Sequence, residues 1–332
     1  DVERSRGLGD VYKRQADGDR EKPKPPKQAE TPKPAETPKP AETPTPAERQ
    51  RQVALHYLRG TKIDDDPSDE VFERFIGAVI DGIGAPPPSR YEKVSYNAGF
   101  WPLSHGGMTD LTYDASLAQG VQLLAERAAE PGEVIFGYSQ GAVAASFYKS
   151  AHSGNRYVLV ENPSRPNGGI MARFPGVSIP VAGVTFSGAT PHNGDHTVDV
   201  ARQYDGWADF PADLWNPLAV ANALMGILVV HGGAQTEVTA DEIRAAESAG
   251  RRYYQYDADS NTVYYLLRTP SLPLLMPFER VLPRRVVDAV AGPLRWFIET
   301  AYDRSDYSRP TRSTFLRPLG LLRRMLQDAG LV

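Results

Sequence analysis

Val134-Ile-Phe-Gly137-Tyr-Ser139-Gln-Gly141-Ala142 is the stretch that decides the fold of this 332-residue chain. A short apolar run, typical of a buried strand, leads directly into Gly-Tyr-Ser-Gln-Gly and then into an alanine-rich helical pattern. A serine between two glycines at such a junction is typical of a nucleophile elbow, a sharp turn with a strained serine and no room for neighbouring side chains. The motif therefore predicts that Ser139 is presented at the carboxyl end of a strand, with Gly137 and Gly141 providing the space.

Short apolar runs alternate with helical patterns on both sides of this motif, which predicts an α/β fold with a mostly parallel sheet covered by helices in three layers. The expected strands are residues 53–58, 94–96, 134–136, 157–160, 181–186 and 197–204, followed by a hairpin of 253–256 and 262–267. The expected helices are residues 69–83, 115–129 with Asp114 as N-cap, 140–150, and one beyond residue 240.

The first 48 residues have a composition that cannot bury a core. Nine of the 29 prolines lie within residues 1–46, together with three copies of Ala-Glu-Thr-Pro-x-Pro. Ten basic and ten acidic residues accompany them, so this stretch is expected to be a disordered, partly polyproline linker. We expect a main α/β domain over residues 49–270 and a C-terminal helical extension over 271–332.

The C-terminal extension differs in charge from the rest of the chain. The net charge of the whole chain is −4, yet residues 280–332 contain ten arginines, no lysine and five acidic residues. Apolar side chains accompany these arginines in two expected helices, at 284–301 and 316–326. The pattern fits either a lid or membrane-facing surface that meets anionic head groups, or a helical layer packed on the sheet.

Several classes of protein are excluded by what the sequence lacks. It has no run of 18 apolar residues and no cysteine, which excludes a spanning helix, disulfides and cysteine-ligated zinc. The sequence also lacks a basic stripe with interleaved aromatic residues, so we expect no nucleic acid as a partner. We expect no metal and no cofactor. Residues 1–15 lack a signal-peptide pattern, and the natural N-terminus is expected to be missing.

A serine nucleophile needs a base, and in this kind of fold the chain order is serine, then acid, then histidine. His192, His196 and His231 follow Ser139. His231 is preferred because an apolar run ends there before two glycines, which would bring an imidazole to the edge of the sheet. The alternative is a capping or buried histidine with a structural role.

The acid that orients the histidine is predicted from the segment 203–211, which follows an expected strand and precedes His231. Asp205 lies nearest the strand end and is the first choice. Asp209 is the reserve, and Asp199, within the expected strand, is third. Each of them could instead cap a helix or form a turn.

An oxyanion hole requires two donors. The first is expected to be the backbone N–H of Gln140, the residue after the nucleophile. The second is expected from Leu58-Arg-Gly-Thr-Lys62, where Thr61 could donate its N–H and its hydroxyl. The alternative for this second segment is an ordinary turn that ends a strand.

Several long motifs, in the same order, resemble the PE-PPE domain of mycobacteria and their relatives over residues 53–310. These motifs are Gly137-Tyr-Ser-Gln-Gly-Ala142, Glu161-Asn-Pro-Ser-Arg-Pro-Asn-Gly-Gly169, Val184-Thr-Phe-Ser-Gly-Ala-Thr190, Tyr204-Asp-Gly-Trp-Ala-Asp-Phe-Pro211, Asn222-Ala-Leu-Met225 and Thr262-Val-Tyr-Tyr-Leu-Leu-Arg-Thr-Pro270. That family is similar to the cutinase-like serine α/β-hydrolases. The resemblance implies an oxyanion role for Arg59-Gly-Thr61, an acid at Asp205 and a histidine at His231, although Gly206 stands where the family pattern commonly has proline.

The resemblance implies a serine esterase that acts on acyl esters. Two alternatives remain: an acyltransferase that moves acyl chains onto trehalose-type glycolipids of the cell envelope, and a catalytically silent module that binds lipid or cell wall. The expected partners are an acyl ester or glycolipid substrate and a membrane or cell-wall surface met by the basic C-terminal segment. A secreted or cell-envelope location is the corresponding expectation.

Overall fold

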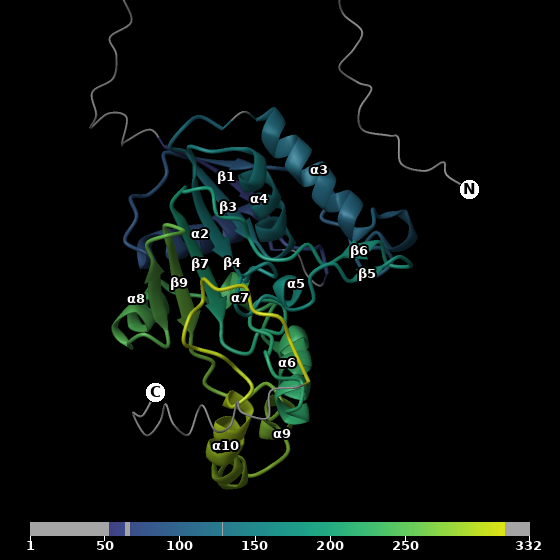
Figure 1. The fold of residues 1–332 in the computed structure, drawn as a ribbon, viewed down its shortest axis with the longest axis vertical. Helices are drawn as coiled ribbons and strands as arrows, with labels where there is room; N and C mark the ends of the chain where they lie inside the picture. Colours follow the sequence, from purple (N-terminus) through teal and green to yellow (C-terminus); the bar gives the residue numbers. More distant parts are fainter. Residues whose placement is uncertain (1–52, 64–66, 128, 316–332) are drawn as a thin grey trace, which may run out of the picture. The chain divides into compact units, whose positions relative to one another are not determined.

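A seven-stranded sheet forms the centre of the computed structural model, which describes residues 53–63, 67–127 and 129–315. The strand order is β2-β1-β3-β4-β7-β9-β8 (Figure 1). Neighbouring strands are parallel except for β8 and β9, which pair as an antiparallel hairpin. The prediction of an α/β fold with a mostly parallel sheet is therefore confirmed.

The strands and helices are regular and mostly short. The strands of the sheet are β1 (Ala54–Leu58), β2 (Arg90–Lys93), β3 (Val134–Tyr138), β4 (Arg156–Val160), β7 (Thr197–Arg202), β8 (Tyr254–Asp257) and β9 (Thr262–Leu267). The helices are α2 (Asp69–Gly82), α3 (Tyr113–Glu126), α4 (Gln140–Ala151), α5 (Ile170–Arg173), α6 (Pro217–Val229), α7 (Ala234–Glu237), α8 (Ala240–Ser248), α9 (Met276–Glu279) and α10 (Arg284–Glu299), with a 3-10 turn at Gly107–Thr109.

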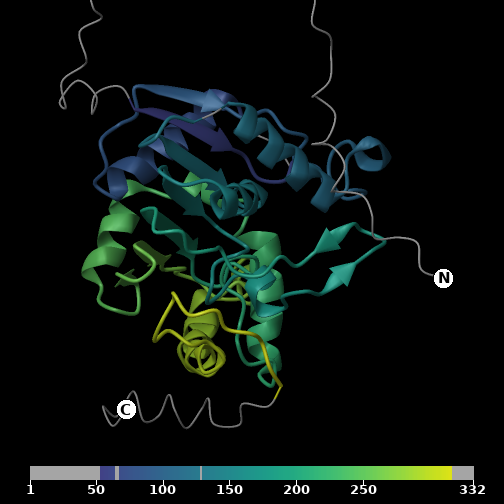
Figure 2. The same cartoon turned by 45° about the horizontal axis from the view of Figure 1, so that its top comes forward.

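Helices cover both faces of the sheet and create three layers, with α2 and α8 on one side and α3 and α4 on the other (Figures 1 and 2). Ile135 and Phe136 are neighbours on β3 but belong to different buried clusters. Successive strand residues point to opposite faces, so Phe136 packs with Phe72 of α2, while Ile135 packs with Leu117 of α3. The central strands β1 and β3 are completely buried, as expected of parallel strands covered on both faces.

Three details of the sequence prediction are wrong. The second strand lies at Arg90–Lys93, earlier than the expected 94–96, because these four residues pair with β1, and Val94 just after them donates to the Tyr57 carbonyl at 2.9 Å. Thr112, rather than Asp114, caps α3, because its side chain accepts a backbone N–H of the first turn. The strand expected at 181–186 is instead part of a separate two-stranded sheet, formed by β5 (Ser178–Ile179) and β6 (Val184–Thr185).

The last turn of α10 and the chain after it pack back onto the body around the sheet. Ile298 and Tyr302 join Tyr204 in one buried cluster, and Tyr307 joins Tyr264 of β9 in another. The described part of the C-terminal segment therefore contributes side chains to the interior. The linker predicted at 1–48 and the helix predicted at 316–326 lie outside the described residues. From residue 53 to 315, apart from the gaps given above, no helix has both the length and the apolar character needed to span a bilayer.

Candidate active site

Ser139 occupies the turn between β3 and α4, with φ 53° and ψ −119°. A positive φ is uncommon for a residue with a side chain and indicates a constrained turn. A Cβ added to Gly137 would lie 2.5 Å from the Ala142 Cα, and one added to Gly141 would lie 2.3 Å from the Leu58 carbonyl oxygen. Because both obstacles are backbone atoms, both positions require glycine, as the sequence motif predicts.

A chain of two hydrogen bonds joins Ser139, His231 and Asp205. The Ser139 Oγ lies 2.7 Å from His231 Nε2, and His231 Nδ1 lies 2.6 Å from Asp205 Oδ2. Asp205 is fully buried just beyond β7, and His231 follows the end of α6. Since a carboxylate only accepts, Nδ1–H donates to Asp205 and Nε2 is left to accept the serine hydroxyl proton.

Two aromatic side chains lie near the imidazole of His231. The Tyr138 ring stacks on it at 5.8 Å between centroids, and the Trp207 ring lies at 6.2 Å. Burial lowers the pKa of His231 to about 4 and raises the pKa of Asp205 to about 6. At neutral pH the site therefore contains a neutral imidazole and an ionised carboxylate, the forms needed for a base and its orienting acid.

The two other candidate acids have different partners. Asp209 pairs with Arg304 at 2.9 Å and accepts the Tyr204 N–H at 2.8 Å. Asp199 lies on β7 in a buried ion pair with an arginine from the loop after β4. Within the described part of the chain, Asp205 is the one of the three that contacts the imidazole.

Both segments proposed for the oxyanion hole lie beside Ser139. The Gln140 N–H belongs to the first residue of α4, where backbone donors have no partner inside the helix. A Cβ added to Gly60 would lie 3.0 Å from the Ser139 Cβ, so the loop that carries Thr61 passes against Ser139. The Gln140 side chain donates to the Gly99 carbonyl at 2.8 Å and fixes the start of the helix.

Glu161 is a third buried group at this site, and the sequence prediction missed it as a site residue. It has no exposed surface, φ is 48°, and one of its carboxyl oxygens lies within 4.8 Å of an Asp205 carboxyl oxygen. The available signal was its position directly after a predicted strand, at the same sheet edge as Ser139.

Glu161, Asp205 and His231 also offer three ligand atoms within 4.8 Å of one another. However, Asp205 Oδ2 and His231 Nδ1 are 2.6 Å apart, which is a hydrogen-bond distance. Two ligands held at about 2.0–2.1 Å from one zinc ion would lie more than about 3 Å apart. The geometry is therefore that of a shared proton.

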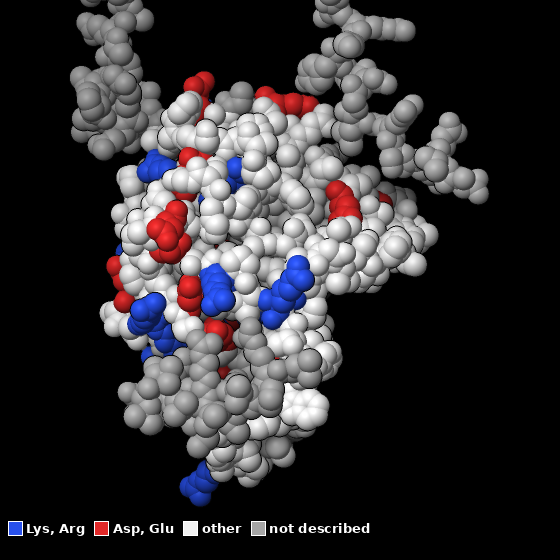
Figure 3. All heavy atoms as spheres, in the orientation of Figure 1, with Lys and Arg blue, Asp and Glu red and all other residues white. Residues whose placement is uncertain are grey.

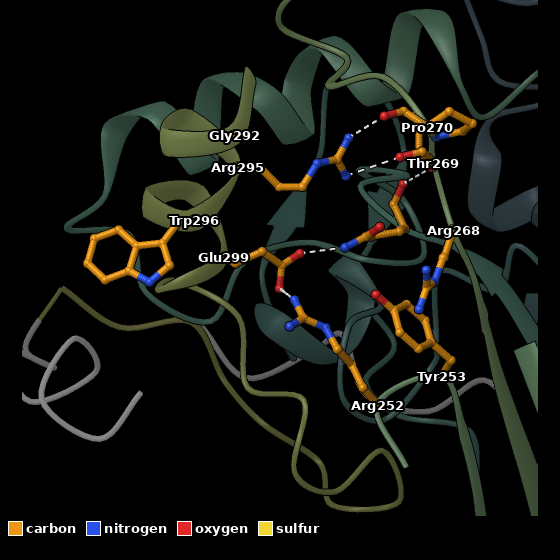
Figure 4. A pocket seen from close by; sticks show the side chains of 10 residues that line it. Arg252, Tyr253, Arg268, Thr269, Pro270, Gly292, Arg295, Trp296 and Glu299 are labelled. Carbon is orange, nitrogen blue, oxygen red and sulfur yellow. Dashed lines mark hydrogen bonds and ion pairs between the residues drawn. The ribbon is translucent and has the colours of Figure 1, made fainter. Parts of the chain in front are cut away.

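A cavity of about 450 Å³ is lined by Gln203, by residues of α10 and by three arginines (Figure 4). Protein groups already contact these side chains. Glu299 pairs with Arg252 and accepts a hydrogen bond from Gln203 at 2.6 Å. Arg295 donates to backbone carbonyls beyond β9, and Arg268 lies over a tyrosine ring. This network ties α10 to the segment that leads to Asp205.

Replacing Glu299 by alanine is expected to lower the free energy of unfolding by about 3–5 kcal/mol, because Arg304 and Arg252 would lose their buried partner. The control is Glu70→Ala in the exposed pair with Arg74, which is expected to cost less than about 0.5 kcal/mol. Urea unfolding at neutral pH measures both. Equal stability of the Glu299 variant and the unsubstituted protein would contradict a stabilising role.

The difference in the free energy of unfolding between the unsubstituted protein and Glu299→Ala is expected to become smaller in acid. Despite its burial, Glu299 has its pKa lowered to about 2 by Arg304 and Arg252. A lowered carboxyl pKa gives stability that is complete above the unfolded-state pKa, 4.5 for this side chain, and is lost as the pH falls through the folded-state value. The stability difference should therefore shrink between pH 4.5 and about 2.

Comparison with known proteins agrees with this architecture. The family model for the PE-PPE domain matches residues 87–303. "Esterase PE16" of Mycobacterium tuberculosis (strain ATCC 25618 / H37Rv) is 35% identical over 268 residues, covering 73% of this chain and 47% of the relative. "Uncharacterized PPE family protein PPE42" of M. tuberculosis (strain CDC 1551 / Oshkosh) is 38% identical over 227 residues, covering 62% and 37%.

A further relative is "Diacyltrehalose acyltransferase Chp2" of M. tuberculosis (strain ATCC 25618 / H37Rv), 30% identical over 146 residues that cover 41% of this chain and 38% of the relative. The chain spans less than half of the length of each of these three relatives. The family model nevertheless covers most of the chain, including the elbow, the acid loop and the histidine. The chain therefore belongs to the PE-PPE domain family.

Proposed function

We propose that this protein is a serine esterase that cleaves acyl esters through an acyl-enzyme on Ser139. The observation that carries the proposal is the hydrogen-bonded chain from Ser139 through His231 to Asp205 at a strained turn. Nucleophile, base and orienting acid in mutual hydrogen-bond reach are what acyl transfer requires. The relative named an esterase supports the same reaction class.

In the first half of the proposed reaction, Ser139 Oγ attacks the ester carbonyl while its proton moves to His231 Nε2. The charge that forms on the carbonyl oxygen would be stabilised by the Gln140 N–H and by Thr61, with the N-terminal end of α4 directed at the same point. The tetrahedral intermediate then expels the alcohol, which takes the proton from His231. The product is an ester of Ser139.

The second half of the reaction repeats these steps with water. His231 removes a proton from a water molecule, the hydroxide attacks the acyl-enzyme, and the proton returns to Ser139 Oγ as the fatty acid leaves. Asp205 accepts the Nδ1–H throughout and stabilises the imidazolium that forms twice in each cycle. If a sugar hydroxyl attacked the same acyl-enzyme in place of water, the protein would act as an acyltransferase. This is the second candidate function, because one relative is named an acyltransferase.

The proposed acyl or glycolipid substrate needs apolar surface near the site. The helix α6, which ends just before His231, exposes Leu224 and Leu228, by 52% and 76%. Val290 and Trp296 of α10 are also exposed, at 47% and 46%. Charged side chains of both signs are interspersed on the face drawn in Figure 3. We propose that α6 and α10 meet acyl chains at a membrane or cell-wall surface of a secreted or envelope protein.

Ester hydrolysis tests the proposal directly. With p-nitrophenyl esters of short and medium acyl chains, the protein is expected to release nitrophenol and free fatty acid in equal amounts, and added trehalose is expected to leave this ratio unchanged. Chromatography of the acyl products makes the measurement. Acylated sugar formed at the expense of fatty acid would favour the transferase, whereas release no faster than in buffer alone would favour the silent binding module.

A further inference from the structure

We propose that Glu161 is a positioning residue, which in its protonated form donates a hydrogen bond to the Asp205 carboxylate and holds that carboxylate against His231. Glu161 acts in catalysis only if Ser139 is the nucleophile proposed above. Its protonation, in contrast, is a property of the folded chain alone. The two claims can therefore be tested separately.

The backbone places Glu161 for this contact. It is the first residue after β4, and its φ of 48° is unusual for a residue with a long side chain. Its N–H donates to the Val200 carbonyl at 2.8 Å, and its two carboxyl oxygens lie 3.0 and 3.1 Å from the Arg202 N–H. The side chain is therefore held from both ends beside β7, the strand that leads to Asp205.

Glu161 and Asp205 are both fully buried, and carboxyl oxygens of the two lie within 4.8 Å of each other. Like charges this close and out of water repel strongly, so the two groups cannot both be ionised. No lysine or arginine forms an ion pair with Glu161 among the residues that the structure describes. The guanidinium of Arg202 forms its ion pair with Glu242, at 3.1 Å. One proton must therefore be shared between Glu161 and Asp205.

The proton belongs on Glu161 because Asp205 has other partners for its negative charge. Asp205 accepts the Trp207 N–H at 2.9 Å and the imidazole Nδ1–H at 2.6 Å. Burial raises the pKa of Glu161 well above its usual range, and the neighbouring charge of Asp205 raises it further. On Asp205 a hydrogen bond from Glu161 favours the ionised form and opposes part of the rise in pKa that burial causes.

The other titratable groups around Glu161 do not change this assignment. Tyr138 of β3 is neutral, since burial raises its pKa well above the usual value, and its hydroxyl donates to the His231 carbonyl at 2.5 Å. His231 is neutral at neutral pH, and Arg202 of β7 is committed to Glu242. The protonated Glu161 thus donates a hydrogen bond to the Asp205 carboxylate while carrying no charge. A cation in its place would compete with His231 for the negative charge of Asp205.

Proton linkage tests the protonation of Glu161 without reference to activity. A glutamate that keeps its proton when folded and loses it when unfolded makes the unfolding equilibrium constant rise about tenfold per pH unit above about pH 4.5. Glu161→Gln removes this proton. When urea unfolding is measured between about pH 6.5 and 8, the unfolding equilibrium constant of the unsubstituted protein should therefore rise more steeply with pH than that of the variant, by the amount that corresponds to one proton. Glu70→Gln, at an exposed site, should parallel the unsubstituted protein.

Parallel pH dependences of the unsubstituted protein and Glu161→Gln would mean that Glu161 is ionised when folded, and the proposal would be wrong even if the protein is an active esterase. A difference of one proton would support it even if no hydrolysis were found. Failure of the positioning role and failure of the esterase role are therefore distinguishable.

The kinetic arm compares Glu161→Gln with Glu161→Ala. Glutamine keeps an N–H donor and is expected to retain most of the turnover, whereas alanine removes the donor and is expected to lower kcat about tenfold or more with little change in KM. Loss of the donor should also raise the pKa of Asp205, so the acid limb of kcat/KM should move to higher pH in the alanine variant alone. An unmoved acid limb in folded Glu161→Ala would overturn the positioning role.

Discussion

Replacing Ser139 by alanine is expected to lower kcat for ester hydrolysis by about 10⁶-fold, and His231→Ala by a similar factor. Alanine at 139 removes the atom that would carry the acyl group, and alanine at 231 removes the base 2.7 Å from it. The double variant should be little worse than either single one, because the two side chains act as a unit. Release of nitrophenol under saturating ester measures all three.

A fluorophosphonate probe provides the matching covalent readout. It is expected to label the unsubstituted protein once, at Ser139, and to leave Ser139→Ala unlabelled. The control is Ser150→Ala, on the exposed side of α4, whose hydroxyl donates to the Phe147 carbonyl within the same helix. That variant should be labelled and should turn over substrate like the unsubstituted protein. Labelling that persists in Ser139→Ala would rule out the proposed nucleophile.

Asp205→Asn is expected to lower kcat by about 10⁴-fold with the fold intact. Asparagine presents an amide that can donate to His231 Nδ1, so the ring would adopt the tautomer that cannot accept the proton of Ser139. The rate should be expressed per active site, counted by the fluorophosphonate titration.

Asp209→Asn is the matched control, because it makes the same chemical change four positions along the same loop. It weakens the contact with Arg304, so we expect a less stable protein that keeps its turnover per folded molecule. Urea unfolding and active-site titration separate the two effects. A crippled Asp209→Asn together with a nearly normal Asp205→Asn would reverse the assignment of the acid.

The sequence was sufficient to predict the turn at Ser139 because its causes are local. The steric need for glycine at 137 and 141 comes from backbone atoms close by, and the strand and helix on either side have clear patterns. It was less informative around α6. That helix is apolar on nearly every side, and an apolar run without periodicity does not distinguish a helix from a strand.

What the sequence by itself determined is the fold class, the strained turn at Ser139 and the chain order of the three side chains that meet there, Ser139, Asp205 and His231. Only the tertiary structure decided which aspartate contacts His231 and which one pairs with Arg304. The sequence favoured Asp205 over Asp209 only by its position nearest the strand end. In the structure Arg304, 95 residues beyond Asp209, packs back and binds Asp209, while Asp205 contacts His231. Charges separated that far along a chain are brought together by the packing of whole segments, and no local pattern records which of them will meet.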